Sequence, residues 1–365
     1  MEVNHIFPGV HYIKEGNFSI LAGCPPEIIK VLMQKNLSPP DVILLPDVPL
    51  ARGESQIAVE FPLYHNLFMN PNKDKTKKLV LLGNSIRVES AKKLLKLCLT
   101  GLDLEELLEE GMEQSDAERL HNETSWFHLK NSDGTFLTID DLVLGVVIED
   151  EAVQMEGLQI ERISPNNFRI SHDTESISIC MDVTEEQKPP YPINYDLIPS
   201  HLVKYGIEVL GGSTGFSATN ASSGLALSHN GNYTLIDAIP YLNYHLKARG
   251  IGRNQVFSLF LSHIHDDHCN LLSLLKYNRK IKILTTHIIY RMMLKKLSYV
   301  MDRSLEEIED YFIFVPLKPG ETTNYYGVKI TPHWSIHSIP TIGARFEVMH
   351  MGKNYSVLFT GDTQS

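Results

Sequence analysis

The sequence contains few cysteines and no long apolar run. Its four cysteines among 365 residues are far apart and form no CxxC pair, which excludes a zinc ribbon and a dense disulfide framework. No run of about 18 apolar residues is present, and the first residues lack the apolar stretch of a signal peptide, so we expect no membrane-spanning helix and no secretory leader. These absences favour a reduced, cytoplasmic setting.

Positive charge is also scarce. Lys and Arg number 33 against 44 Asp and Glu, which gives a formal net charge of -11. An acidic surface disfavours broad contact with a nucleic-acid backbone, because such contact needs clustered Lys and Arg. We therefore expect no strong nucleic-acid patch. A small-molecule or phosphodiester substrate held by metal ions remains compatible with this charge.

The polar, proline-containing stretch 184–201 is the best linker candidate, because its prolines break helices and central strands. We predict an N-terminal α+β domain over 1–190 and a second domain over 191–365. We find no chemistry-bearing motif in the first. Its predicted helices cover 25–36, 90–101 and 103–112, and its predicted strands cover 41–48, 77–83, 166–172 and 177–183.

After the linker, strands occur in adjacent pairs and also alternate with helices. This order favours an α/β architecture of two mixed sheets packed together, with helices outside. The predicted strands are 207–212, 222–228, 232–239, 256–261, 280–286, 326–334, 344–351 and 355–361, and the predicted helices are 241–250, 271–277, 288–301 and 304–312.

The segment "SHIHDDH" (262–268) directly follows the apolar strand "VFSLFL" (256–261). On an extended segment His263 and His265 point the same way and can hold one ion, whereas Asp267 and His268 can face a neighbouring position. Imidazole and carboxylate groups suit Zn, Fe, Mn or Ni. A solvated polar loop would explain one histidine, but this spacing favours a metal site.

"SHIHDDH" resembles the H-x-H-x-D-H signature of the metallo-β-lactamase-fold hydrolases. The segments "TLIDA", "HSIPTIGARFEV" (337–348) and "VLFTGDT" (357–363) are similar to further family segments and occur in the family's order. The glycine-rich stretch 210–227 resembles the phosphodiesterase branch, which includes tRNA 3′-end processing endonucleases and cyclic-nucleotide phosphodiesterases. The resemblance covers about 207–365.

The resemblance implies an αββα sandwich and a dinuclear site that activates water, with phosphodiester hydrolysis as the expected reaction. It also implies two divalent metal ions, zinc first and iron or manganese as alternatives. Asp267 and Asp237 are the candidate catalytic residues, and Asp237 would fix the orientation of the ligands. The implied ligands are His263, His265 and His337 for one metal, Asp267 and His268 for the other, and Asp362 as a bridge.

The chain departs from the family pattern after Asp362, because the family's last histidine ligand follows that position. We therefore expect the C-terminal part of the sandwich to be missing: either the chain is a fragment, or a partner chain or a second copy in a homo-oligomer completes the site. Two alternatives stay open. The same ligands could hold two irons in a non-hydrolytic oxygen or redox sensor, or the site could be vestigial in an interaction module.

Several further residues near these segments are weaker candidates. Cys269 is expected to be a buried, inert thiol rather than a redox-sensitive one. Ordinary structural roles are at least as expected for the remaining candidates, which are His333, His287, Ser213, Thr214 and Ser217.

Overall fold

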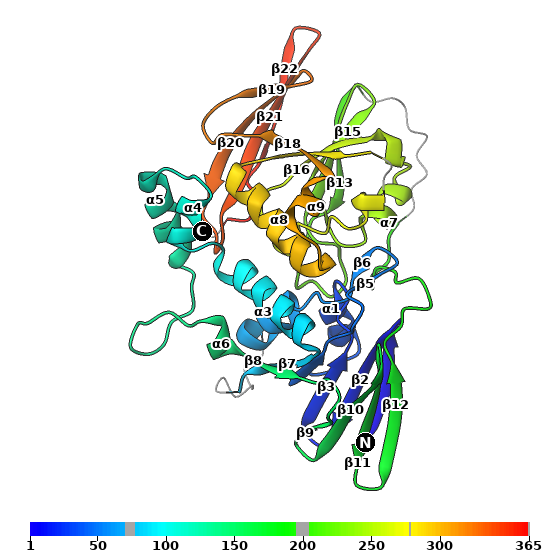
Figure 1. The fold of residues 1–365 in the computed structure, drawn as a ribbon. Coiled ribbons are helices and arrows are strands. Elements are labelled where there is room, and N and C mark those ends of the chain that lie inside the picture. Colours follow the sequence, from blue (N-terminus) through cyan, green and yellow to red (C-terminus); the bar gives the residue numbers. More distant parts are fainter. Residues whose placement is uncertain (70–76, 195–203, 277–278, 364–365) are drawn as a thin grey trace.

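The computed structural model describes residues 1–69, 77–194, 204–276 and 279–363. The chain forms two sheet-based halves, one stacked on the other, with the N-terminal half coloured blue to green in Figure 1. None of the helices in these ranges combines the length and apolar character needed to cross a membrane. Residues 195–201 of the predicted linker lie outside the described ranges.

The N-terminal half is built on a six-stranded sheet of order β1-β2-β3-β4-β7-β8. Its first two pairings are antiparallel and its last three are parallel. The strands are β1 Glu2–Phe7, β2 Val10–Glu15, β3 Phe18–Ala22, β4 Val42–Leu44, β7 Leu79–Gly83 and β8 Val143–Val147.

A second, antiparallel sheet of order β12-β11-β10-β9 covers one face of the first. Apolar side chains such as Ile20 and Val42 pack there against Ile160 and Phe168. The strands are β9 Val153–Met155, β10 Leu158–Ser164, β11 Asn167–His172 and β12 Glu175–Cys180, with a separate small hairpin of β5 Leu50–Ala51 and β6 Glu54–Ser55.

Among the helices of this half, α3 (Ser85–Thr100) packs on the other face of the six-stranded sheet, against β7 and β8. This helix, the longest of them, begins after Asn84, whose side chain accepts a hydrogen bond from the Arg87 amide, and ends at Gly101 with φ 68°, a backbone conformation that glycine adopts readily. The helices are α1 Ile28–Gln34, α2 Glu60–Tyr64, α3 Ser85–Thr100, α4 Leu104–Glu109, α5 Gln114–Ser125 and α6 Ile139–Leu142, and a π-helical turn His65–Met69 extends α2.

The C-terminal half contains two sheets. The first has the order β13-β14-β15-β16-β17-β18, and its last three pairings are parallel. Its strands are β13 Tyr205–Gly211, β14 Gly224–His229, β15 Asn232–Ile236, β16 Val256–Phe260, β17 Ile281–Thr285 and β18 Phe312–Pro316.

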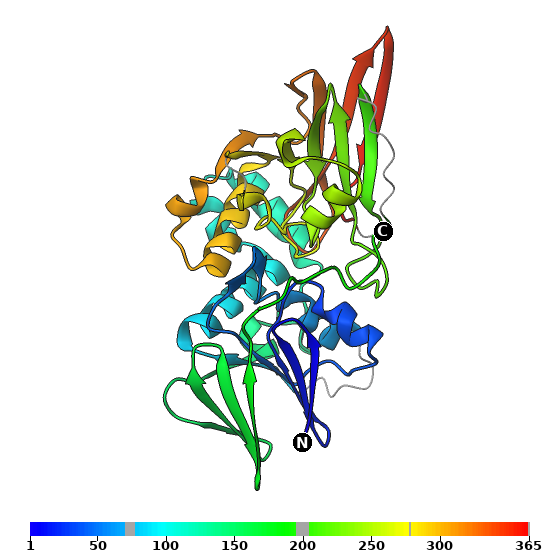
Figure 2. The same cartoon turned by 90° about the vertical axis from the view of Figure 1, so that its right-hand side faces the viewer.

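The second sheet is antiparallel throughout, so the expectation of two mixed sheets is wrong for this one. Phe260 of the first sheet contacts Phe346 and Phe359 of the second, with ring centroids 5.3 and 6.3 Å apart, so the sheets pack face to face (Figure 2). The strands of the second sheet are β19 Thr323–Tyr325, β20 Val328–Ser335, β21 Thr341–His350 and β22 Lys353–Phe359.

The helices of the C-terminal half are α7 Leu242–Ala248, α8 His287–Met301 and α9 Leu305–Glu309. The helix predicted over 271–277 is wrong, because the described residues of this stretch, 271–276, form only a 3-10 turn, Leu274–Lys276. Leu271 and Leu274 are completely buried. Tertiary burial of this apolar run therefore accounts for its leucines without a helix.

The apolar core continues from one half into the other. Helix α3 lies along α8, as Figure 1 shows. Ion pairs between the halves include Arg87 with Asp302 and Arg291 with Glu110, each at 2.7 Å. Residues 1–190 therefore pack against the second half, and their independence as a domain stays a prediction.

Candidate metal centre

The histidine-rich loop lies at the carboxyl ends of the parallel strands β15 and β16. Ligands commonly bind at this edge of parallel sheets. Asp237 directly follows β15, and its amide donates to the carbonyl of Phe260 at the end of β16. The Ala238 amide donates to the carbonyl of His268 at 2.7 Å. These bonds fix the loop against the strand end.

Four histidine rings meet at this point, although they come from distant segments. His263, His265 and His268 belong to the loop after β16, and His337 comes from the connection between β20 and β21. His263 Nε2 and His337 Nε2 each lie 3.1 Å from His265 Nδ1. Three nitrogen atoms bound to one tetrahedral zinc would be separated by roughly 3.3 Å, which is close to this spacing.

The hydrogen bonds around two of these rings determine where their protons lie. His265 Nε2 faces the carbonyl oxygen of Cys98 at 3.0 Å and must donate to it, which leaves a lone pair on Nδ1. The Ser262 hydroxyl donates to Asp237 Oδ2 and therefore accepts from His263 Nδ1, which leaves a lone pair on His263 Nε2. Two lone pairs thus face each other, an arrangement that a cation between them would stabilise.

A proton does not fill this gap near neutral pH. Burial lowers the pKa of both His263 and His265 well below the usual value, and the neighbouring imidazoles lower it further. Burial also lowers the pKa of His337, whose Nδ1 has no hydrogen-bond partner among the described residues. Neutral imidazoles facing one another at this distance are the donor set that a divalent transition metal binds.

A second donor group lies beside the first. His268 Nε2 is 3.5 Å from Asp267 Oδ2 and 3.4 Å from Oδ1 of Asp362, which follows the end of β22. Burial alone would lower the pKa of His268, but the surrounding carboxylates raise it well above the usual value. Contact with His268 lowers the pKa of Asp362 to about 2 despite its partial burial. Excess negative charge at this position also suits a cation.

Asp237 supports the rings from behind. Its carboxylate accepts hydrogen bonds from the Ser262 amide at 2.8 Å, the Ser262 hydroxyl at 2.7 Å and His268 Nδ1 at 2.8 Å. The ligand atoms of Asp237, His263 and His268 also lie within 4.8 Å of one another, close enough to share an ion. Because both Asp237 oxygens are already occupied by donors, this residue is better suited to orient the rings than to bind the ion.

A cavity of about 620 Å³ opens onto this cluster. The described residues that line it include no lysine and no arginine. Those from the C-terminal half are Gly212, Ser213, Thr214, Gly215, Phe216, Ser223, His265, Asp267, His268, His337, Ser338 and Asp362, and those from the N-terminal half are Glu60, Phe61, Tyr64, Phe68, Leu99, Phe127 and Leu129.

The sequence interpretation did not identify the contribution of the N-terminal half. The carbonyl of Cys98 orients His265, and Glu60 Oε2 accepts a hydrogen bond from the Asp266 amide at 3.1 Å. No spacing rule marks these residues, because they reach the loop only through the packing of the two halves.

Some of the weaker candidates from the sequence line the cavity, and the others do not. Ser213 and Thr214 line the cavity, whereas Ser217, His333 and His287 are not among its lining residues. Cys269 is buried, and burial raises its pKa to about 12, which keeps the thiol protonated.

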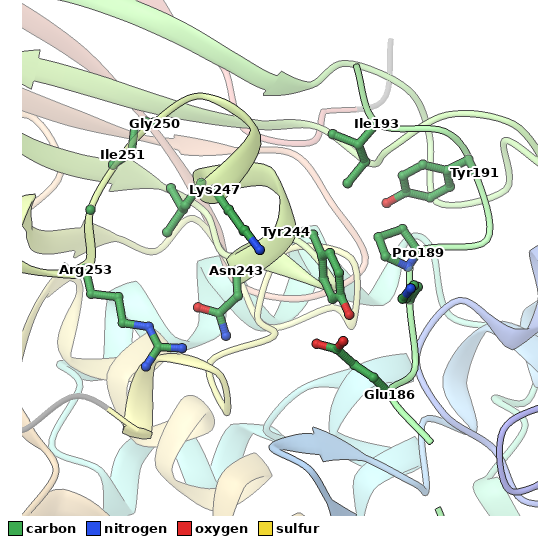
Figure 3. A pocket seen from close by; sticks show the side chains of 13 residues that line it. Glu186, Pro189, Tyr191, Ile193, Asn243, Tyr244, Lys247, Gly250, Ile251 and Arg253 are labelled. Carbon is green, nitrogen blue, oxygen red and sulfur yellow. The ribbon is translucent and has the colours of Figure 1, made fainter. Parts of the chain in front are cut away.

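A second cavity, of about 750 Å³, lies between the segment before residue 194 and helix α7. Figure 3 shows Lys247, Asn243 and Arg253 on one side and Glu186 and Tyr191 on the other. Neither of the two potential metal-binding groups found among the described residues is located here.

Two facing sheets, with a histidine-rich loop after a parallel strand, define residues 205–363 as a metallo-β-lactamase-like α/β sandwich. Within this fold class, residues 205–365 match the family described as Anti-Pycsar protein Apyc1. The predicted resemblance and fold class are thereby confirmed for this part of the chain.

Two curated relatives from Dictyostelium discoideum are similar in sequence. The cGMP-dependent 3′,5′-cGMP phosphodiesterase A is 30% identical over 160 residues, 44% of this chain and 18% of the relative. The cAMP/cGMP-dependent 3′,5′-cAMP/cGMP phosphodiesterase B is 25% identical over 204 residues, 54% of this chain and 18% of the relative. The match thus spans less than a fifth of these relatives.

Among solved structures, the metallo-β-lactamase fold protein YhfI from Bacillus subtilis is 20% identical, with a TM-score of 0.34 over 43% of this chain and 62% of that chain. The short form of human tRNase Z is 16% identical, with a TM-score of 0.33 over 42% of this chain and 67% of that chain.

Proposed function

We propose that this protein is a metal-dependent hydrolase that cleaves phosphodiesters at a dinuclear site. The observation that carries the proposal is the pair of imidazole lone pairs on His263 and His265, which face each other at 3.1 Å. The similarity to two cyclic-nucleotide phosphodiesterases supports the substrate class.

His263, His265 and His337 would hold one ion, Asp267 and His268 would hold the other, and Asp362 would bridge them. When bound, two such ions supply Lewis-acid activation of a phosphoryl group and of water near neutral pH.

The residues of the chain contribute orientation and charge. Asp237 and the carbonyl of Cys98 hold the imidazole rings in the tautomers that direct lone pairs at the ion. Asp267 and Asp362 bring negative charge that balances the two cations. The absence of lysine and arginine among the described lining residues leaves the metals as the positive charge that binds the substrate phosphate.

The test combines elemental analysis with turnover of bis-p-nitrophenyl phosphate and 3′,5′-cyclic nucleotides by the 365-residue chain. We expect about two equivalents of metal per chain. The His263→Ala variant should lose metal and turnover, whereas His287→Ala, an exposed histidine outside the cavity, should retain both.

Turnover that survives in His263→Ala would refute the proposal. A visible iron-oxo absorption band without hydrolysis would instead support the oxygen- or redox-sensor alternative.

A further inference from the structure

Helix α2 and its π-helical extension place three aromatic residues along the cavity. Phe61, Tyr64 and Phe68 are spaced by three and four residues, so they share one face of the helical segment. All three line the cavity that contains the metal-ligand cluster. We call these three residues the aromatic wall. They belong to the N-terminal half, outside the residues that match the Apyc1 family.

Contacts on both sides hold the aromatic wall in place. The Tyr64 hydroxyl donates to the carbonyl of Cys98 at 3.1 Å, the same carbonyl that accepts from His265. The Tyr64 ring stands at 87° to the His265 ring, with centroids 6.0 Å apart. Phe61 packs against Phe216 of the glycine-rich loop at 5.1 Å. The wall is therefore fixed directly beside a proposed metal ligand.

The outer end of the wall is an exposed aromatic side chain. Phe68 is 57% exposed, although it contacts Tyr64 at 5.9 Å between ring centroids. Aromatic faces exposed in a cavity favour planar rings, and stacking on them tolerates different bases. A cavity of about 620 Å³ lies in the range that encloses one small ligand. One region of the cavity is thus aromatic, whereas the other carries the metal ligands.

We propose that the aromatic wall binds the base of a nucleotide substrate while the metal cluster holds its phosphate. This assignment rests on the proposed phosphodiesterase function, and it gives the N-terminal half a role in substrate selection. Phe68 supplies an open stacking face, and Phe61 and Tyr64 fix the direction from which the base enters.

The test measures binding rather than turnover, so it is independent of catalysis. The affinities of the zinc-loaded chain for AMP and for ribose 5-phosphate, which lacks the base, are compared by isothermal titration calorimetry. We expect wild type to prefer AMP by at least about fivefold, the lower end of base–aromatic stacking. Phe68→Ala should lose most of this preference by weakening AMP binding alone.

Phe136→Ala is the matched control, because Phe136 is a phenylalanine of the same half, 47% exposed, outside the cavity lining. It should keep the wild-type preference. Equal or undetectable affinity for AMP and ribose 5-phosphate in wild type would overturn the proposed role of the aromatic wall in base binding. An unchanged preference for AMP in Phe68→Ala would overturn it as well. Failure to hydrolyse diesters together with a Phe68-dependent AMP preference would overturn the proposed hydrolysis but leave the wall in place.

Discussion

The Asp237→Asn substitution tests whether hydrogen bonds behind the rings control metal binding. Asp237 accepts three hydrogen bonds, two from Ser262 and one from His268. An asparagine can keep the bond from the Ser262 amide through its oxygen. Its NH₂ group would then face the Ser262 hydroxyl and His268 Nδ1, where the native carboxylate oxygen accepts.

The free energy lost in Asp237→Asn depends on which hydrogen-bond donors lose their acceptor. Hydrogen bonds to a charged group contribute about 1.5–3 kcal/mol each, and at least the His268 bond is lost. The Ser262 hydroxyl would also lose its acceptor and turn its hydrogen away from the NH₂ group, toward His263 Nδ1, which disfavours the tautomer that leaves a lone pair on His263 Nε2. Loss of such supporting bonds lowers metal affinity by about 10–100-fold, and we expect this range for Asp237→Asn.

The backbone does not complicate this experiment. Asp237 has φ 62°, in the left-handed region that asparagine and aspartate both tolerate. Asp173→Asn is the control, because Asp173 is an exposed residue with φ 50° far from the cavity. Zinc affinity is measured by competition with a chromogenic chelator, and the stability of the metal-free chain by urea unfolding. Zinc affinity of Asp237→Asn within about twofold of wild type would refute the positioning role.

Three further substitutions test the ligands, the packing around them and a distant buried acid. Asp362→Ala should reduce bound metal from about two equivalents toward one by elemental analysis, since the proposed bridge is lost. In Gly215→Ala the new Cβ would lie 2.3 Å from the Phe61 ring and 2.8 Å from Asp267 Oδ2, so urea unfolding should show a loss of about 1–3 kcal/mol. Glu54 is buried, which raises its pKa to about 8, so its contribution to stability is full below about pH 4.5 and is lost as the pH rises through 8. Glu54→Gln should therefore gain a few kcal/mol of stability relative to wild type as the pH rises from about 4.5 to 8, measured by urea unfolding. A stability difference that does not change with pH would contradict this explanation.

The ligand loop could be predicted because its information is local. His263 and His265 alternate on an extended segment after an apolar strand, and the structure places their nitrogens together. His337 and Asp362 were assigned through family resemblance, and both lie beside the loop in the structure. Their roles as metal ligands stay predictions that the metal analysis decides.

The wall and the support from the N-terminal half could not be predicted in the same way. Phe61, Tyr64 and Phe68 have the spacing of an ordinary core-facing helix, and nothing in that spacing distinguishes a core from a cavity. The support at Cys98 is a backbone carbonyl, which has no sequence signature at all. The predicted helix over 271–277 was wrong for a related reason, since burial of leucines does not require helical hydrogen bonds.

The charges around the loop would link the proposed binding of metal ions to the proposed binding of a phosphate substrate. Lys296 is a buried cation near the cluster, with Nζ 2.6 Å from Asp266 Oδ1 and 3.8 Å from Glu60 Oε2. It also donates to the carbonyl of Ile264, so its charge stabilises the back of the loop and does not line the cavity. The carboxylates of Asp267 and Asp362 do line it. An anionic phosphate entering the metal-free cavity would therefore be repelled by the carboxylates of Asp267 and Asp362. With metal ions held by these carboxylates, the cations would attract the phosphate instead. For this reason the metal ions and the phosphate should bind with positive cooperativity.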